Sequence, residues 1–158
     1  MYIDLSSYPI ELELVYEFSK DMTNDPHLIR DTHQLTLDKS RPFMGLRGDK
    51  GLFGTQEWWE NIHAKVIPSE IKSGVITRTY VAGMENLAQD NSFEYVDDTG
   101  KLHDEGIYTL NKNKRSLFRL NHLVVIYYAY DEMKASTIED PDYLCNVIEM
   151  AISKMPVR

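Results

Sequence analysis

The segment Leu123-Val-Val-Ile-Tyr-Tyr-Ala-Tyr130 decides the fold that this sequence predicts. It is apolar on both faces and rich in β-branched and aromatic residues, which is typical of a strand in the centre of a sheet. The segment belongs to a longer stretch, from Ile71 to the C-terminus, in which alternating residues are interrupted by turn signals. The stretch therefore predicts a small, mostly antiparallel sheet.

Four further strands are predicted around this central one. The five are expected near residues 71–81, 93–96, 102–109, 122–130 and 143–153. Asp97-Asp98-Thr99-Gly100 predicts a tight hairpin turn, because glycine accepts a positive φ. Polar loops are expected at 83–91, 111–116 and 136–142, and a helix stays the alternative for 143–153.

The first forty residues predict a pair of strands. Apolar and acidic side chains alternate from Ile10 to Phe18, which favours a half-buried strand over the competing helix. Residues 20–32 are interpreted as a loop around Asn24-Asp25-Pro26. The alternation from His33 to Asp38 predicts a strand that could pair with the first.

One helix is expected near residues 55–66. Glycines at four positions make regular structure improbable in 39–54, and Thr55 then has the character of an N-cap. Trp58, Trp59 and Ile62 follow with helical spacing, and Pro68 ends the pattern.

The fold class expected is mainly β, within the α+β class. We expect a bent five-stranded antiparallel sheet, or a small barrel of OB-like or SH3-like type, from about residue 71. Residues 1–70 would form an N-terminal elaboration packed on a core of residues 71–154, so that the whole chain, 1–158, is one domain.

Composition indicates a soluble cytoplasmic protein. The chain has 158 residues, 42% of them hydrophobic, which is enough to form a core without disulfides. The single cysteine, Cys145, fits a reducing compartment. We see neither a signal peptide nor an apolar run long enough to span a bilayer.

The net charge of −8 is concentrated in two acidic stretches. Residues 85–105, beginning at Glu85, hold seven carboxylates against one lysine, and residues 131–142 hold five against one. Such a surface repels phosphate backbones, so a nucleic-acid partner is disfavoured and a basic protein partner is favoured. Solvated turns that keep the protein soluble are the simpler interpretation of the same residues.

No motif predicts a metal, a cofactor or a phosphate loop. The five histidines lack metal-ligand spacing, and the glycines of 45–54 match no nucleotide-binding pattern. In His103-Asp104-Glu105 the middle side chain would point away from its neighbours on a strand, so the three form no chelate alone. We expect no metal and no cofactor.

An enzyme is likewise not expected. Cys145 stands among apolar residues and is interpreted as a packed thiol, and His122 as a hydrogen-bonded core or edge histidine. If the fold did assemble an active site, its members would be the 103–105 cluster with His63 or His122.

Aromatic residues leave a second hypothesis open. Adjacent tryptophans on a helix lie about 100° apart, so one of Trp58 and Trp59 could anchor the helix while the other is partly exposed. The simpler interpretation is that both belong to the core. Tyrosines on the predicted strands could stack on bases in a ligand- or nucleic-acid-binding barrel. Positive charge for that role would come from Lys112, Lys114, Arg115 and Arg119.

Two segments resemble known proteins. They are Gly51-Leu-Phe-Gly-Thr-Gln-Glu-Trp-Trp59, and the stretch from Leu117 through the central strand to Lys134. Both are similar to segments of small, acidic bacterial immunity proteins of polymorphic or contact-dependent toxin systems. The resemblance implies a cytosolic antitoxin that binds a toxin domain and blocks its active site.

The function expected is therefore a non-enzymatic protein-binding module, most simply an immunity protein that neutralises a basic toxin domain, with no nucleic acid and no membrane involved. Its partner-binding residues would be the acidic loops and the tryptophan pair: Asp97, Asp98, Asp104, Glu105, Asp131, Glu132, Glu139, Asp140, Asp142, Trp58 and Trp59.

Overall fold

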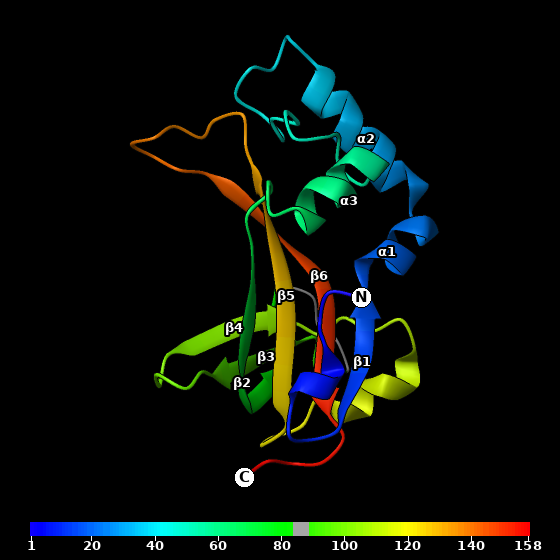
Figure 1. The fold of residues 1–158 in the computed structure, drawn as a ribbon, viewed down its shortest axis with the longest axis vertical. Helices are drawn as coiled ribbons and strands as arrows, with labels where there is room; N and C mark the ends of the chain where they lie inside the picture. The colour runs from blue at the N-terminus through cyan, green and yellow to red at the C-terminus, as the bar shows by residue number, and fades with distance from the viewer. Residues whose placement is uncertain (84–88) are drawn as a thin grey trace. The chain divides into compact units, whose positions relative to one another are not determined.

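A six-stranded antiparallel sheet dominates the fold (Figure 1). The computed structural model describes residues 1–83 and 89–158, so Glu85 and the centre of the predicted 83–91 loop lie outside the described residues. The strands are β1 (Leu12–Glu17), β2 (Ser69–Tyr80), β3 (Ser92–Val96), β4 (Leu102–Gly106), β5 (Leu123–Glu132) and β6 (Tyr143–Ser153). Their order in the sheet is β1-β6-β5-β2-β3-β4.

The mainly β prediction is confirmed, and so are the five strands beyond residue 71. Residues 143–153 are strand rather than helix, and the 10–18 segment supplies β1, a sixth strand that pairs with β6. The barrel form of the prediction is wrong, because the sheet is not closed. Among the described residues, β1 and β4 are each paired along one side only.

The helices are short. They are the 3₁₀ turns η1 (Leu5–Ser7), η2 (Met22–Asn24) and η3 (Lys112–Leu117), and the α-helices α1 (Phe18–Asp21), α2 (Pro26–Leu37) and α3 (Gln56–His63). The helix expected at 55–66 is confirmed as α3, and the Thr55 hydroxyl accepts a hydrogen bond from the Trp58 N–H, as an N-cap should.

The predicted loop at 20–32 and strand at 33–38 are wrong, because α1, η2 and α2 occupy these residues. Asp25 is the N-cap of α2, its carboxylate accepts from the Leu28 N–H, and Pro26 occupies the first turn. Proline at this position starts a helix, since its missing N–H would have had no partner there. The face of α2 that is partly buried carries Thr32, His33 and Thr36 besides leucine and isoleucine, so no apolar helical period is visible.

Two smaller boundaries also differ. The strand predicted at 102–109 ends at Gly106, and the basic segment predicted as the loop 111–116 forms the 3₁₀ helix η3. In η3 the Asn111 side chain accepts from the Asn113 N–H, which caps the turn in the way asparagine favours.

Contacts within the chain divide it into two compact units. Unit 1 comprises Met1–Glu17, Ile71–Tyr127 and Glu149–Arg158, and unit 2 comprises Phe18–Glu70 and Tyr128–Ile148. The expectation of a single domain stays a prediction.

The core of unit 1 is built from the central strands. Val124, Val125 and Ile126 of β5 are fully buried, as expected for a strand apolar on both faces. The ring of Phe93 on β3 packs against that of Phe118, with their centroids 5.3 Å apart. His122 is buried and its Nδ1 lies 2.7 Å from the Ser153 carbonyl oxygen, so the prediction of a hydrogen-bonded core histidine is confirmed.

A buried carboxylate holds the N-terminus in unit 1. The Glu149 side chain accepts hydrogen bonds from the backbone N–H groups of Tyr2 and Ile3. Within the described residues its other oxygen, Oε2, is buried without a hydrogen-bond partner. Burial raises the pKa of the Glu149 carboxyl, Glu17 raises it further, and the two N–H groups and the N-terminal amine oppose the rise.

This carboxyl makes stability depend on pH. A raised pKa means that the folded chain binds the proton more tightly than the unfolded chain, so stability falls as pH rises from about 4.3 through the raised value. We expect the wild type to lose stability across that window relative to Glu149→Gln, as measured by urea unfolding between pH 4 and 7. Glu139→Gln, which removes an exposed carboxylate, serves as the matched control for the loss of one negative charge. A difference for Glu149→Gln that stayed constant, or ran in the opposite direction, would contradict the assignment.

The core of unit 2 surrounds α3. Trp58 and Ile62 are fully buried, and the Trp58 ring packs against Phe53 and Phe18 at centroid distances of 5.0 and 6.0 Å. The chain passes very close to this helix at Gly51, where φ is +97° and an added Cβ would lie 2.6 Å from the Trp58 nitrogen. Only glycine fits that combination of backbone angle and close approach.

Candidate partner-binding surface

The turn between β3 and β4 uses its first aspartate internally. Asp97 Oδ1 accepts from the Thr99 hydroxyl at 2.6 Å and from the backbone N–H groups of Thr99 and Lys101, and Oδ2 lies 2.8 Å from His103 Nε2. The Thr99 and His103 bonds hold the pKa of the Asp97 carboxyl well below its usual range. Asp98 beside it is exposed. The predicted hairpin turn is present, with Gly100 at φ +88°.

The other two carboxylates of this hairpin are also engaged. Asp104 accepts from the Tyr80 hydroxyl at 2.9 Å, and Glu105 accepts from the Gly106 N–H at 2.9 Å. Burial and the Asp104 hydrogen bond together raise the pKa of Tyr80. Three of the four predicted binding residues on this hairpin thus stabilise local structure.

Trp58 and Asp131 face each other in the interior of unit 2. The indole N–H of Trp58 donates to Asp131 Oδ1 at 2.9 Å, and the Asn146 amide donates to Oδ2 at 2.6 Å. Burial raises the pKa of the Asp131 carboxyl, and these two hydrogen bonds oppose the rise. Both residues were predicted to bind a partner, but their buried positions give them a structural role.

Trp59 and Glu132 lie nearer the surface of unit 2. Trp59 is half-buried, with its ring centroid 4.8 Å from that of Trp58. The sequence had left open which tryptophan is exposed, and the answer is that Trp58 is the anchor. Glu132 forms an ion pair with Arg47.

The three remaining carboxylates, Glu139, Asp140 and Asp142, lie in the loop that joins β5 to β6. All three are exposed, and none forms an ion pair with another described residue. The loop itself is ordered by backbone contacts: the Asp140 N–H donates to the Thr137 hydroxyl and the Asp142 N–H to the Ser136 hydroxyl, each at 2.9 Å.

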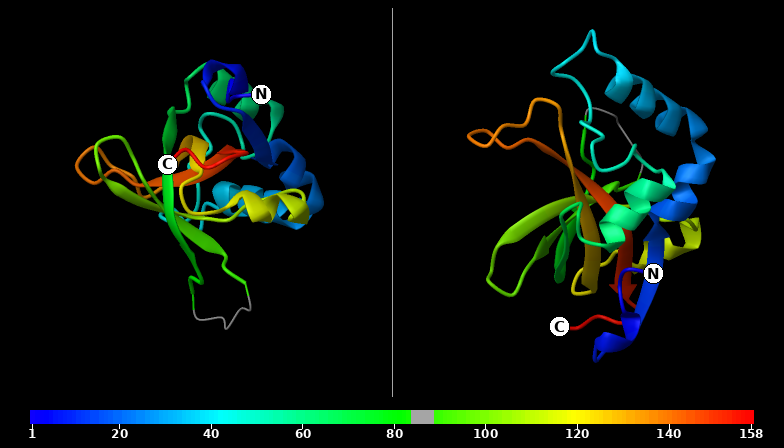
Figure 2. Two further views of the ribbon diagram at one scale, coloured as in Figure 1. Left: turned by 90° about the horizontal axis from the view of Figure 1, so that it is seen from below. Right: turned by 45° about the horizontal axis from the view of Figure 1, so that its top comes forward.

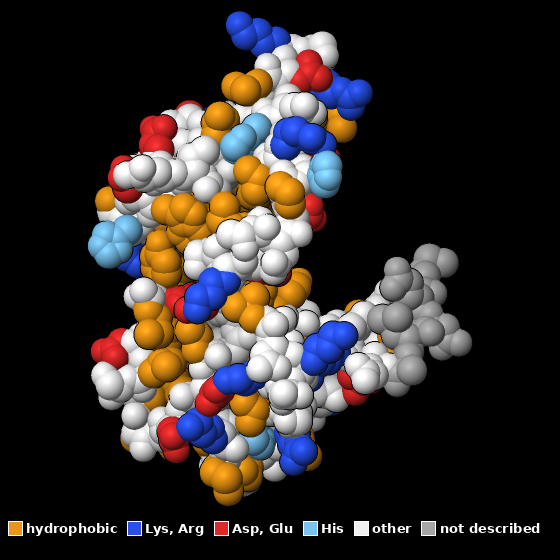
Figure 3. Space-filling view, turned by 90° about the vertical axis from the view of Figure 1, so that its right-hand side faces the viewer, with side chains coloured by type: hydrophobic (Ala, Val, Ile, Leu, Met, Phe, Trp, Pro, Cys, Tyr) orange, Lys and Arg blue, Asp and Glu red, His pale blue; other side chains and the backbone are white. Residues whose placement is uncertain are grey.

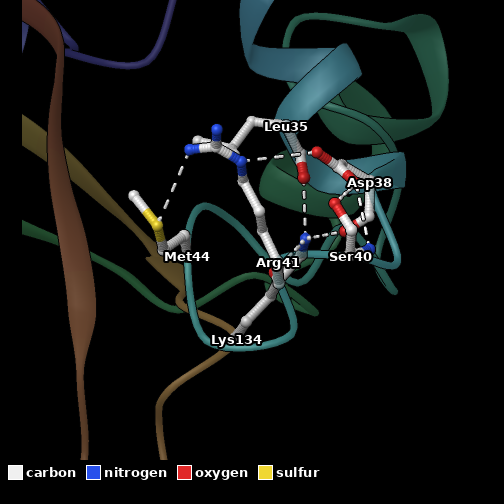
Figure 4. Close-up of polar contacts among 6 residues, drawn as sticks. All are labelled: Leu35, Asp38, Ser40, Arg41, Met44 and Lys134. Atoms are coloured by element: carbon white, nitrogen blue, oxygen red, sulfur yellow. Dashed lines mark hydrogen bonds and ion pairs between the residues drawn. The ribbon is translucent and has the colours of Figure 1, made fainter.

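Lys134 organises the base of this loop and the segment that follows α2. Its ammonium group donates to the carbonyl oxygens of Leu35, Asp38 and Arg41 at 2.7, 3.2 and 3.1 Å (Figure 4). Three donors thus meet three acceptors, one of them in the last turn of α2 where carbonyls lack helical partners. The Ser40 hydroxyl donates to Asp38, a bond that lowers the pKa of that carboxyl.

Arg47 links the same two segments. Its guanidinium group donates to the Ser136 carbonyl oxygen at 2.8 Å as well as pairing with Glu132. Its backbone N–H donates to the Glu132 carbonyl oxygen at 2.9 Å. Neither Arg47 nor Lys134 was predicted from the sequence, because their partners are mainly backbone carbonyl groups, which no side-chain pattern reveals.

Large apolar side chains are exposed on the same segments. Phe43, Met44 and Ile138 are 77%, 52% and 100% exposed. Figure 3 shows further hydrophobic side chains among lysines and arginines where α2 lies, and Leu28 and Leu37 are the exposed leucines of that helix. The signal that could have revealed Phe43 and Ile138 was present, since both are apolar residues inside segments predicted as loops.

The basic and aromatic residues of the second hypothesis are differently placed. Lys114 forms an ion pair with Glu13, and the Arg115 guanidinium donates to the Asp90 carbonyl oxygen at 2.6 Å. Lys112 and Arg119 are exposed. Tyr95, Tyr127 and Tyr128 are buried, so their rings do not offer a face on which a base could stack.

Each of the two candidate catalytic histidines, His103 and His122, forms its own hydrogen bond, and the structure does not bring the two together through these bonds. His103 is bonded to Asp97, and His122 to a backbone carbonyl oxygen. Among the described residues no group of three or more His, Cys, Asp and Glu side chains is placed to hold a metal ion. Cys145 is exposed, so its interpretation as a packed thiol is wrong. It lies in the exposed first half of β6, where alternation does not bury a side chain.

Comparison with known proteins places this chain in the class of immunity proteins. The family model described as "Immunity protein RhsI2" matches residues 12–153, from the first residue of β1 to the last residue of β6. The chain belongs to this family, which confirms the resemblance to immunity proteins of bacterial polymorphic toxin systems. A search of curated proteins found no match. None of the helices in the described part of the chain is long and apolar enough to cross a membrane.

Proposed function

We propose that this chain is a non-enzymatic immunity protein that binds a cognate bacterial toxin domain in the cytoplasm and neutralises it. The match of the RhsI2 immunity family model to residues 12–153 carries the proposal. Membership of this family supports a toxin as the binding partner, and the experiments below are designed to identify that toxin.

The charge of the chain supports a basic toxin surface as the target. The net charge is −8, and Asp98, Asp104, Glu139, Asp140 and Asp142 are exposed carboxylates. Exposed charges of one sign speed the encounter with a partner of the opposite sign. The engagement of His103 and His122 in single structural bonds supports a binding role over a catalytic one.

Protection of a cell is the direct test. Where a toxin gene lies immediately upstream of the gene for this chain, bacteria that express the C-terminal domain of that toxin should grow only when the chain is co-expressed. An empty vector and an unrelated acidic protein of similar size are the controls. Growth arrest that persists in the presence of folded, co-expressed chain would refute the proposal.

Salt should slow the association of the two proteins. Exposed charges are screened over about 10 Å at 0.1 M ionic strength and over about 3 Å at 1 M. We therefore expect the association rate constant to fall roughly tenfold or more between 50 and 500 mM NaCl, and the dissociation rate constant to change much less. Stopped-flow fluorescence with the purified toxin domain measures both, and the unfolding of each protein alone over the same salt range is the control. An association rate that is insensitive to salt would remove electrostatic steering from the proposal.

A further inference from the structure

We propose that the toxin is bound by one end of unit 2, made of residues 38–47 after α2 and residues 133–142 between β5 and β6. We call these two segments the double-loop surface. The inference rests on the proposed function and deepens it, because it selects one of the two acidic hairpins as the binding site.

The two segments lie side by side. The Lys134 N–H donates to the Gly45 carbonyl oxygen and the Arg47 N–H to the Glu132 carbonyl oxygen, each at 2.9 Å, and Leu46 pairs with Met133 as an isolated β-bridge. Both segments lie at the same end of unit 2 in Figure 1 and in the right panel of Figure 2. A single partner can therefore touch both.

Three apolar side chains project from this surface without contributing to the core. Ile138 is completely exposed, and Phe43 and Met44 are more than half exposed. Large apolar side chains such as these lose accessible surface when a partner covers them, which favours binding, and a few residues buried in this way dominate the energy of an interface. Single exposed apolar residues are ordinary, but three on adjoining loops are typical of an interaction site.

The loops that carry these side chains are held in place from beneath. Lys134 ties three carbonyl groups of residues 35–41 together, and Arg47 bonds to Glu132 and Ser136. The Thr137 N–H donates to the Asp140 carbonyl oxygen at 3.1 Å, which closes the tip next to Ile138. A surface that is ordered before binding loses less entropy when it binds.

The exposed charges indicate the kind of partner, and they distinguish the β5–β6 hairpin from the β3–β4 hairpin as the binding site. Glu139, Asp140 and Asp142 are exposed, with no ion pair among the described residues, and so are available to a partner's cations. The carboxylates of Asp97 and Asp104 on the β3–β4 hairpin already accept internal hydrogen bonds. On the other segment Arg41 is paired with Asp38 and Lys39 is exposed, so the acidic side of the surface is residues 139–142. The occupant that fits is a folded toxin domain with an apolar depression bordered, where it faces residues 139–142, by lysine and arginine.

Isothermal titration calorimetry with the toxin domain against which the chain protects cells tests the surface. Two variants probe it: the apolar variant Phe43→Ser/Ile138→Ser, and the charge variant Glu139→Gln/Asp140→Asn/Asp142→Asn. We expect the dissociation constant to rise at least tenfold for the apolar variant and about tenfold for the charge variant at low salt. The matched control Asp98→Asn/Asp104→Asn, on the other acidic hairpin, should stay within about twofold of wild type.

The outcomes separate this inference from the proposed function. If wild type binds and the double-loop variants bind as tightly, or if the control variant loses the affinity instead, the surface is wrong and the immunity function stands. If correctly folded wild type does not bind the toxin domain at all, both fall. A wild-type dimer in solution that the apolar variant converts to monomer would assign the surface to a second copy of this chain and overturn the inference. Thermal unfolding of each variant shows whether folding is intact. The two probing variants should match wild type, because all the side chains changed in them are exposed.

Discussion

Replacement of Trp58 by alanine is expected to lower the free energy of unfolding by about 3–5 kcal/mol, the range for removal of a large buried aromatic side chain. Trp58 is fully buried, and its ring packs against Phe18, Phe53 and Trp59. The change also removes the indole N–H from Asp131, a buried carboxylate that would keep the Asn146 amide as its hydrogen-bond donor among the described residues. Urea unfolding followed by circular dichroism measures the loss.

Two further variants separate volume from hydrogen bonding. Trp58→Phe removes the donor to Asp131 together with only part of the ring volume. A loss of about 1.5–3 kcal/mol is expected from the hydrogen bond to a charged group, with a further, smaller cost for the lost volume. Trp59→Ala removes the half-buried neighbour and should cost less than Trp58→Ala. A larger loss for Trp59→Ala than for Trp58→Ala would contradict the assignment of Trp58 as the anchor.

Replacement of Lys134 by methionine should cost about 2–3 kcal/mol of stability, since hydrogen bonds to a charged group contribute about 1.5–3 kcal/mol each and water replaces part of them. Methionine keeps the apolar length of the side chain and removes the three bonds to the carbonyl oxygens of Leu35, Asp38 and Arg41. Amide hydrogen exchange should accelerate at Arg41 and Met44, whose N–H groups donate within the segment that Lys134 holds. Chemical unfolding and exchange mass spectrometry measure the two effects.

Lys39→Met is the matched control for this prediction. Lys39 is an exposed lysine of the same segment, and its replacement should change stability by less than about 0.5 kcal/mol. Equal effects of the two substitutions would mean that Lys134 acts through general charge and not through its three carbonyl partners.

The strands of this fold were predictable because their burial follows local patterns. β5 is buried on both faces and is apolar on both, and α3 begins at a threonine whose side chain caps it. Helix α2 was missed because Asn24-Asp25-Pro26 serves both turns and helix starts, and nothing local chooses between the two. The sequence also could not show whether the sheet closes into a barrel, because closure depends on pairing between strands that are far apart in the chain.

The candidate surface was predictable only in part. The acidic loops were found from composition, and the sequence identified Glu139, Asp140 and Asp142 as exposed candidates. It did not distinguish them from Asp97 or Asp131, whose carboxylates accept hydrogen bonds inside the fold. That distinction depends on tertiary partners: a turn that folds back on Asp97, and an indole that reaches Asp131 from 73 residues away.

β4 lies at the edge of the sheet, and this position gives its charged side chains a second role besides their hydrogen bonds. Among the described residues β4 is paired only with β3, so the outer row of its peptide groups could accept a strand from another molecule. Edge strands of this kind invite aggregation, and proteins protect them with charged side chains and short lengths. β4 has five residues, Leu102–Gly106, and carries Asp104 and Glu105 next to each other. These carboxylates would repel a second copy at the open margin of the sheet and so oppose edge-to-edge association of the protein.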